Sequence, residues 1–79
     1  MNATRERLLT CFSLVFAGKS PEQLALADID NLPEWDSSNH ILLMQVIAEQ
    51  FGSPIPDDAM GELTSFAAVE QYLNREGSH

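Results

Sequence analysis

The chain has 79 residues, of which 44% are hydrophobic, and its formal net charge is -8. A chain of this length forms a single domain, here residues 1–79, with a modest core and no room for a deep pocket between two domains. Its acidic surface is expected to repel nucleic-acid phosphates and anionic membranes, because neither gains counterion release from it.

Much of the negative charge lies in one part of the sequence. No Lys or Arg occurs between Lys19 and Arg75, whereas ten acidic residues do: Glu22, Asp28, Asp30, Glu34, Asp36, Glu49, Asp57, Asp58, Glu62 and Glu70. Such a region is often only a solvated face that keeps a protein soluble. It equally predicts attraction to basic patches on partner proteins.

The first predicted element is an amphipathic helix over residues 3–17, ended by Gly18. Its apolar side chains recur at spacings of three and four: Leu8, Cys11, Phe12, Val15 and Phe16. Arg5 and Arg7 precede this apolar run, as in signal peptides, but polar residues interrupt both regions, so the helix is favoured. Cys11 is the only cysteine and is expected to be a small core residue, which suits a cytoplasmic protein.

A second, brief helix or turn is predicted after Ser20, which is followed by Pro21 at the first helical position and Gln23 at the capping-box position. Residues 27–36, ADIDNLPEWD, have the composition of a loop. Pro33 disfavours helix at the preceding residue. It also stands where a calcium-binding loop requires glycine, so a calcium site is not expected here.

The second long helix is predicted to begin at Asp36 or Ser37 and to end at Gly52, before Pro54. Its expected apolar stripe is Ile41, Leu43, Met44, Ile47, Ala48 and Phe51. A short helical turn is predicted within residues 55–63. The last helix is predicted to begin near Thr64 or Ser65, to carry Phe66, Val69, Tyr72 and Leu73 on one side, and to end before Gly77. Sustained period-two alternation is absent from the sequence, so the fold class is all-α: a small bundle of three to four helices with a long first connection.

The sequence offers little for metal binding or catalysis. His40, His79 and Cys11 are not spaced as zinc ligands. Asp36, Ser37 and His40 invite comparison with a nucleophilic triad, but neighbours on one turn of a convex helix provide neither a cleft nor oxyanion donors. His40 is therefore interpreted as an exposed residue of the first turn. Trp35 is interpreted as a staple that packs over the start of the helix.

Three motifs in order resemble the acyl carrier protein family over most of the chain. They are Asp36-Ser37 at the start of the middle helix, Glu49-Gln50-Phe51-Gly52 at its end, and the following Ile55-Pro56-Asp57. The resemblance implies a carrier-type helical bundle that is not an enzyme. It implies 4'-phosphopantetheine attached to Ser37 by a transferase, with Asp36 as the adjacent motif residue. The thiol of that arm would carry acyl or aminoacyl groups between enzymes of a fatty-acid, polyketide or other specialised pathway.

Partner enzymes with basic docking patches are expected to contact Ser38, Ile41, Leu42, Glu49, Asp57 and Asp58 of a monomeric carrier. Ser38 departs from the family, which usually has leucine there, and the helix has few acids, so a dedicated carrier is favoured. Cargo between the helices would contact Phe12, Leu43, Ile47, Val69 and Leu73, although core packing is the simpler interpretation of these residues. The alternative function is an unmodified acidic module that binds a basic protein.

Overall fold

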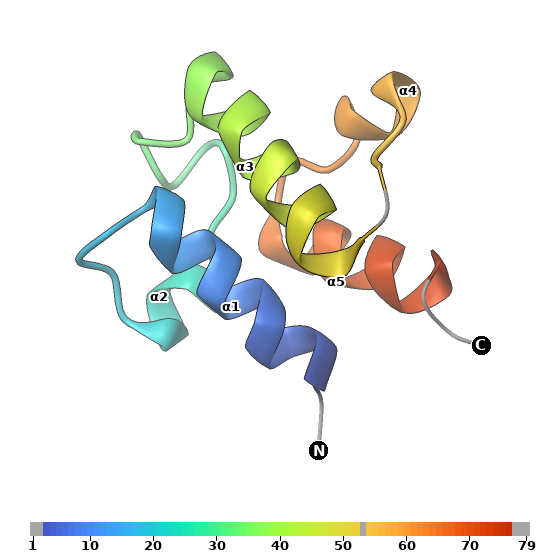
Figure 1. Ribbon diagram of the computed structural model, residues 1–79. Helices are drawn as coiled ribbons and strands as arrows, with labels where there is room; N and C mark the ends of the chain where they lie inside the picture. Colours follow the sequence, from blue (N-terminus) through green and yellow to red (C-terminus); the bar gives the residue numbers. More distant parts are fainter. Residues whose placement is uncertain (1–2, 53, 77–79) are drawn as a thin grey trace.

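The computed structural model of the chain describes residues 3–52 and 54–76. Within these ranges the chain forms helices and no strand: α1 (Ala3–Val15), α2 (Pro21–Ala25), α3 (Ser37–Phe51), α4 (Asp57–Met60) and α5 (Phe66–Glu76) (Figure 1). The all-α prediction is therefore confirmed. The five helices of the described residues are one more than the upper end of the expected three to four, because both short predicted turns form helices. The predicted stop at Gly77, and His79, lie outside the described residues.

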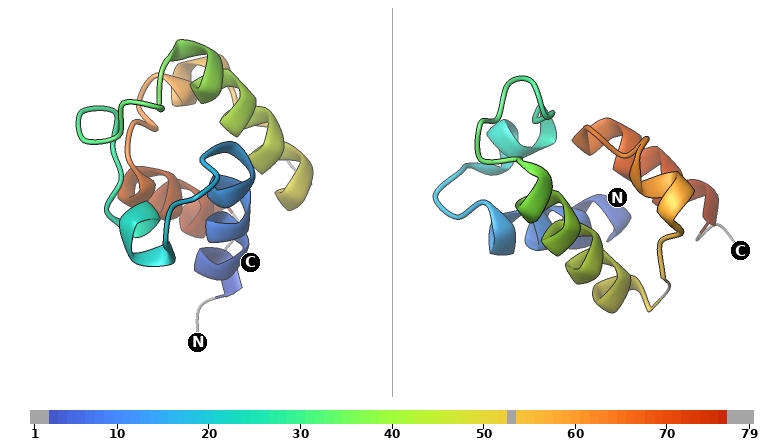
Figure 2. Two further views of the ribbon diagram at one scale, coloured as in Figure 1. Left: turned by 90° about the vertical axis from the view of Figure 1, so that its left-hand side faces the viewer. Right: turned by 90° about the horizontal axis from the view of Figure 1, so that it is seen from above.

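Helix α1 is the centre of the packing, since it contacts α2, α3 and α5. The views in Figure 2 show α3 beside α1, with α5 on the other side of the bundle. The helix ends at Val15, two residues earlier than predicted. The amide of Phe16 still donates to the carbonyl of Phe12 at 2.7 Å, and Gly18 has φ 89°, a conformation that favours glycine at a helix stop.

The core is built around four aromatic side chains from three segments: α1 with the residue that follows it, the long connection, and α5. The ring centroid of Phe12 lies 5.0 Å from that of Phe66, 5.4 Å from Trp35 and 6.0 Å from Phe16. The surrounding aliphatic and sulfur-containing side chains are almost fully buried: Leu8, Cys11, Leu24, Leu43, Met44, Ile47 and Val69. Cys11 is a buried free thiol, as predicted. Burial of this kind, at about 25 cal/mol per Å² of apolar surface, is the main stabilising contribution in so small a domain.

Helix α2 and the long connection that follows it are both held by specific hydrogen bonds. Ser20 caps α2 through its hydroxyl, and Gln23 completes the predicted capping box. Farther along, Oδ1 of Asp28 accepts from the amides of Asp30 and Asn31 at 2.8 Å each. The side chain of Asn31 in turn accepts from the amide of Asp28 at 2.9 Å. These bonds give the acidic segment a fixed shape, although its composition predicts only a loop.

Two backbone hydrogen bonds tie this connection to the start of α5. The amide of Ile29 donates to the carbonyl of Thr64 at 3.1 Å, and the amide of Phe66 donates to the carbonyl of Ala27 at 2.9 Å. They form an isolated antiparallel bridge between Asp28 and Ser65. The bridge fixes the connection immediately before α3 against the last helix.

Ion pairs link the helices and loops as well. Arg5 of α1 forms two hydrogen bonds to the carboxylate of Glu70 on α5, at 2.8 and 2.9 Å. Lys19 lies 3.3 Å from the carboxylate of Glu34, across the long connection. The pKa of the Glu34 carboxyl is lowered by a hydrogen bond to the backbone of the same residue and by the ammonium of Lys19. No helix in the described part of the chain is long and apolar enough to cross a membrane.

Candidate functional site: a pocket at the start of helix α3

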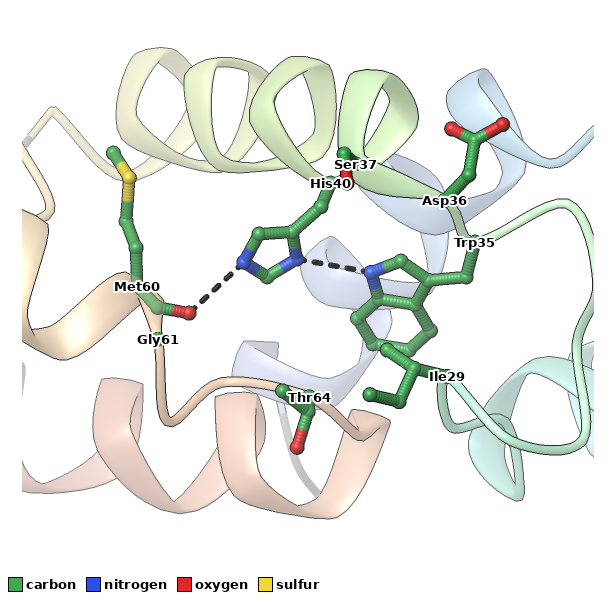
Figure 3. Close-up of a pocket in the computed structure, with 8 residues that line it drawn as sticks. All are labelled: Ile29, Trp35, Asp36, Ser37, His40, Met60, Gly61 and Thr64. Carbon is green, nitrogen blue, oxygen red and sulfur yellow. Dashed lines mark hydrogen bonds between the residues drawn. The ribbon is translucent and has the colours of Figure 1, made fainter.

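A surface pocket of about 470 Å³ lies beside the start of α3. Three segments supply its walls: the long connection, the first turn of α3, and the chain from the end of α4 towards α5. Its lining residues are Ile29, Trp35, Asp36, Ser37, His40, Met60, Gly61 and Thr64 (Figure 3). The bridge between Asp28 and Ser65 explains why the first and third segments stay close together.

Helix α3 begins at Ser37, one of the two predicted positions, and Asp36 fixes this start. This residue is the N-cap, and its carboxylate accepts from the amide of Asn39 at 2.9 Å. Ser37 is then the first helical residue, and its side chain is exposed. The first amides of a helix have no acceptor within the helix, and the helix dipole is positive at this end. Ser37 therefore stands at a position that favours a negatively charged group.

Ser37 and Ser38 differ in their position relative to the pocket. Both side chains are exposed, so access alone does not distinguish them. Ser37 lines the pocket, whereas Ser38 does not. A group attached to Ser37 therefore begins its path at the pocket wall.

The prediction that His40 is an ordinary exposed residue of the first turn is wrong. Its ring is partly buried and bridges two segments. The indole Nε1–H of Trp35 donates to Nδ1 of His40 at 3.0 Å, and Nε2 of His40 lies 2.9 Å from the carbonyl oxygen of Met60 (Figure 3). Because an indole N–H can only donate, Nδ1 must be the acceptor, and the proton belongs on Nε2.

Trp35 fulfils the predicted staple and extends into the core. It directly precedes the N-cap, and His40 is the fourth residue of the helix, so the two occupy the positions of a hydrophobic staple. Their ring planes are inclined by 27°, with centroids 6.1 Å apart. The side chain of Trp35 is nevertheless only 4% exposed and packs edge-on against Phe12. It is both a pocket wall and a core residue.

The arrangement does not assemble a nucleophile and its base. Both ring nitrogens of His40 are engaged by Trp35 and Met60, and neither is hydrogen-bonded to Ser37. Among the described residues, no group of three or more His, Cys, Asp and Glu side chains could hold a metal ion. The described residues of the pocket therefore do not provide Ser37 with a hydrogen-bonded base that would activate it as a nucleophile.

The predicted partner surface is exposed. Ser38, Ile41, Leu42 and Glu49 follow one another at spacings of three, one and seven residues on one face of α3. Ile41 is 54% and Leu42 46% exposed. Ile41 was also expected in the apolar stripe, and that part of the prediction was wrong, because the buried face is centred on Leu43, Met44 and Ile47. The remaining two residues, Asp57 and Asp58, are exposed on α4.

The predicted cargo-lining residues do not line the pocket. Phe12, Leu43, Ile47 and Val69 are fully buried and Leu73 is 8% exposed, all within the core cluster. The interpretation of these side chains as core is thus confirmed. The pocket wall instead includes Ile29, Met60, Gly61 and Thr64, which sequence reasoning missed. No periodic signal marks them, because they come from loops that meet only in the folded chain.

Comparisons of the chain with protein-family models, with curated proteins and with solved structures gave no match.

Proposed function

We propose that the protein is a carrier that bears 4'-phosphopantetheine on the hydroxyl of Ser37 and presents thioester-linked acyl or aminoacyl groups to partner enzymes. The observation that carries the proposal is the position of Ser37. It is the exposed first residue of α3, follows the capping Asp36 and borders the pocket. The order of the motifs around it, which resembles that of acyl carrier proteins, supports the same assignment.

The physical setting of Ser37 suits a phosphodiester. A negative charge at the amino end of a helix is stabilised by about 0.3–1 kcal/mol through the helix dipole when the site is exposed. Amides of the first turn can also donate to its oxygens. This contribution is enough to orient the arm and too small to drive a reaction. The chemistry belongs to the thiol of the arm and to the enzymes that it visits.

The pocket beside Ser37 would receive the first part of the arm or a short cargo. Its walls combine apolar surface from Ile29 and Trp35 with the hydroxyl-bearing Thr64. The exposed Ile41 and Leu42 lie on α3, close in sequence to Ser37, and would provide an apolar centre for docking. The surrounding acids would attract basic enzymes and speed their approach.

Intact mass after incubation with coenzyme A and a broad-specificity transferase tests the proposal. The expected result is a gain of one phosphopantetheine that Ser37→Ala abolishes and Ser38→Ala preserves. Ser38→Ala is the matched control, since it removes an exposed hydroxyl one residue away. No gain in the unaltered protein, or a gain that survives Ser37→Ala, would falsify the assignment.

A second candidate is an unmodified module that binds a basic protein. The observation in its favour is the exposed apolar pair Ile41 and Leu42 on an acidic domain. This function predicts partner binding that salt weakens and that Ser37→Ala leaves unchanged. The carrier function predicts that enzymes of its pathway turn over only the modified protein.

A further inference from the structure

His40 connects two parts of the fold that share few other contacts. Helix α4 is not among the helices that pack extensively on one another. The hydrogen bond between Nε2 of His40 and the carbonyl of Met60, at 2.9 Å, joins α3 directly to the last residue of α4. The same ring holds the indole of Trp35 at 3.0 Å on its other side. The imidazole therefore spans the pocket from one wall to the other, as Figure 3 shows.

The two bonds require one protonation state. A neutral imidazole with its proton on Nε2 donates to Met60 and accepts from Trp35. A protonated imidazole is a donor at both nitrogens. Its Nδ1–H would then face the indole N–H, which cannot accept, so that one of the two bonds must break. Imidazole is the side chain that ordinarily changes charge between about pH 5 and 8.

We propose that His40 is a protonation-sensitive latch: in its neutral form it ties Trp35 to Met60 across the pocket beside Ser37, and protonation releases Trp35. The protonated ring still donates from Nε2 to the carbonyl of Met60, so α3 stays joined to α4. The wall of the pocket that Trp35 forms is thereby loosened as the pH falls. The consequence for an arm on Ser37 rests on the proposed function, whereas the latch itself does not.

Acidic residues occur on each of the segments that surround the His40 imidazole. Asp36 is the only acidic or basic residue among those that line the pocket besides His40 itself, and its carboxylate points away from the imidazole in Figure 3. On the neighbouring segments, Glu34, Asp57, Asp58 and Glu62 are exposed, and Asp28 is partly buried. The test therefore needs a variant that retains all of these carboxylates.

His40→Gln is that variant. Glutamine offers one acceptor oxygen and an NH₂ donor, so it can bond both Trp35 and Met60, and it does not titrate. The chain has one tryptophan, so its single indole N–H resonance reports Trp35 without ambiguity. The experiment follows this resonance, and the amides of Ser37 and Gly61, by ¹H–¹⁵N NMR of the full chain from pH 8 to pH 5.

In the unaltered protein we expect the indole signal to move upfield in a one-proton transition, with both amides following at the same midpoint. In His40→Gln the three signals should lack that transition. The proposal is overturned if the unaltered protein and the variant titrate alike, if the indole signal does not move, or if it moves without the two amides.

A second measurement keeps the proposal testable if the variant does not fold. The ¹⁵N shifts of the His40 ring at pH 8, assigned with a His79→Gln variant, must show a proton on Nε2 and none on Nδ1. The opposite tautomer refutes the latch. Neither measurement uses phosphopantetheine, so a failure to modify Ser37 counts against the carrier function alone, and a flat indole titration counts against the latch alone.

Discussion

Arg5 and Glu70 lie 65 residues apart in the sequence and form a two-bond ion pair that joins the first helix to the last. The Glu70 side chain is 11% exposed, whereas that of Arg5 is 51% exposed. The carboxylate raises the pKa of the Arg5 guanidinium through these bonds. The pair is therefore asymmetric: its negative member is mostly shielded from water, and its positive member is not.

We expect Arg5→Met to destabilise the protein more than Glu70→Gln does. The first change takes two hydrogen bonds from a carboxylate that water reaches poorly, whereas the second leaves a guanidinium that water solvates. Arg7→Met is the matched control, because it removes the same charge from α1 at an exposed position, where the guanidinium lies 5.8 Å from the centroid of the Phe51 ring. Urea unfolding measures all three. A larger loss for Glu70→Gln would contradict the asymmetry.

The adjacent leucines of α3 should respond very differently to truncation. Leu43 is fully buried, so Leu43→Ala should cost about 2–5 kcal/mol of unfolding free energy through lost burial and a residual cavity. Leu42 is 46% exposed, and Leu42→Ala should change stability by about 0.5 kcal/mol or less. Chemical denaturation compares the two. Under the proposed carrier function, binding to a partner enzyme should show the reverse order of sensitivity among variants that remain folded.

Capping and modification can be separated at consecutive residues. Asp36→Ala removes the carboxylate that accepts from the amide of Asn39 and should cost about 1 kcal/mol, whereas Asp36→Asn should retain most of the cap. Ser37 is the exposed first residue of α3, so Ser37→Ala should leave the melting temperature nearly unchanged. Thermal denaturation of the three variants tests this. A large loss from Ser37→Ala would show that the hydroxyl has a structural role.

The buried thiol predicts a loss of stability in alkali. Burial raises the pKa of Cys11 above its ordinary value of 9.0. The folded protein then holds the thiol proton more tightly than the unfolded chain. Its contribution to stability is therefore complete below about pH 9 and is lost as the pH rises through the folded-state pKa. Melting temperatures from pH 8 to pH 10 should fall more steeply for the unaltered protein than for Cys11→Ala. Equal slopes would rule this contribution out.

Added salt should raise the melting temperature, because the net charge of -8 makes the compact state repel itself. Between about 10 mM and 150 mM ionic strength the screening length falls from about 30 to 8 Å. Asp58→Asn, which relieves repulsion from Asp57, should melt higher at low salt and respond less to added salt. A melting temperature that stays constant or falls with salt would show that repulsion does not limit stability.

The helices were predictable because their signals are local. Ser20, Pro21 and Gln23 define the start of α2 by their own chemistry, and Asp36 and Gly52 define the ends of α3. The buried stripe of α1 was equally clear, because this central helix is covered by others and its apolar spacing matches its packing. Ile41 was misplaced on the buried face of α3, because the packed face of that helix is narrower than its apolar stripe.

The pocket was less predictable, because its walls meet only through tertiary contacts. A sequence motif marks Asp36 and Ser37 as candidate site residues. Met60 and Thr64, which line the same pocket, come from a segment that no sequence pattern connects to α3. The bonds of His40 depend on where the indole of Trp35 and the carbonyl of Met60 lie after folding. Sequence spacing predicts on which face of α3 the His40 ring lies. It does not predict that the ring contacts Trp35 or Met60.

Under the proposed carrier function, the backbone bridge between Asp28 and Ser65 bears on how short a substrate of the phosphopantetheinyl transferase could be. A synthetic peptide spanning residues 34–52 would contain the Asp36-Ser37 motif and all of α3. It would lack the opposite wall, from Met60 to Thr64, and both residues of the bridge that holds this wall in place. Such a peptide would present the serine hydroxyl on an isolated, marginally stable helix. A transferase that recognises the intact domain would therefore depend on its C-terminal third as well as on the Asp36-Ser37 motif.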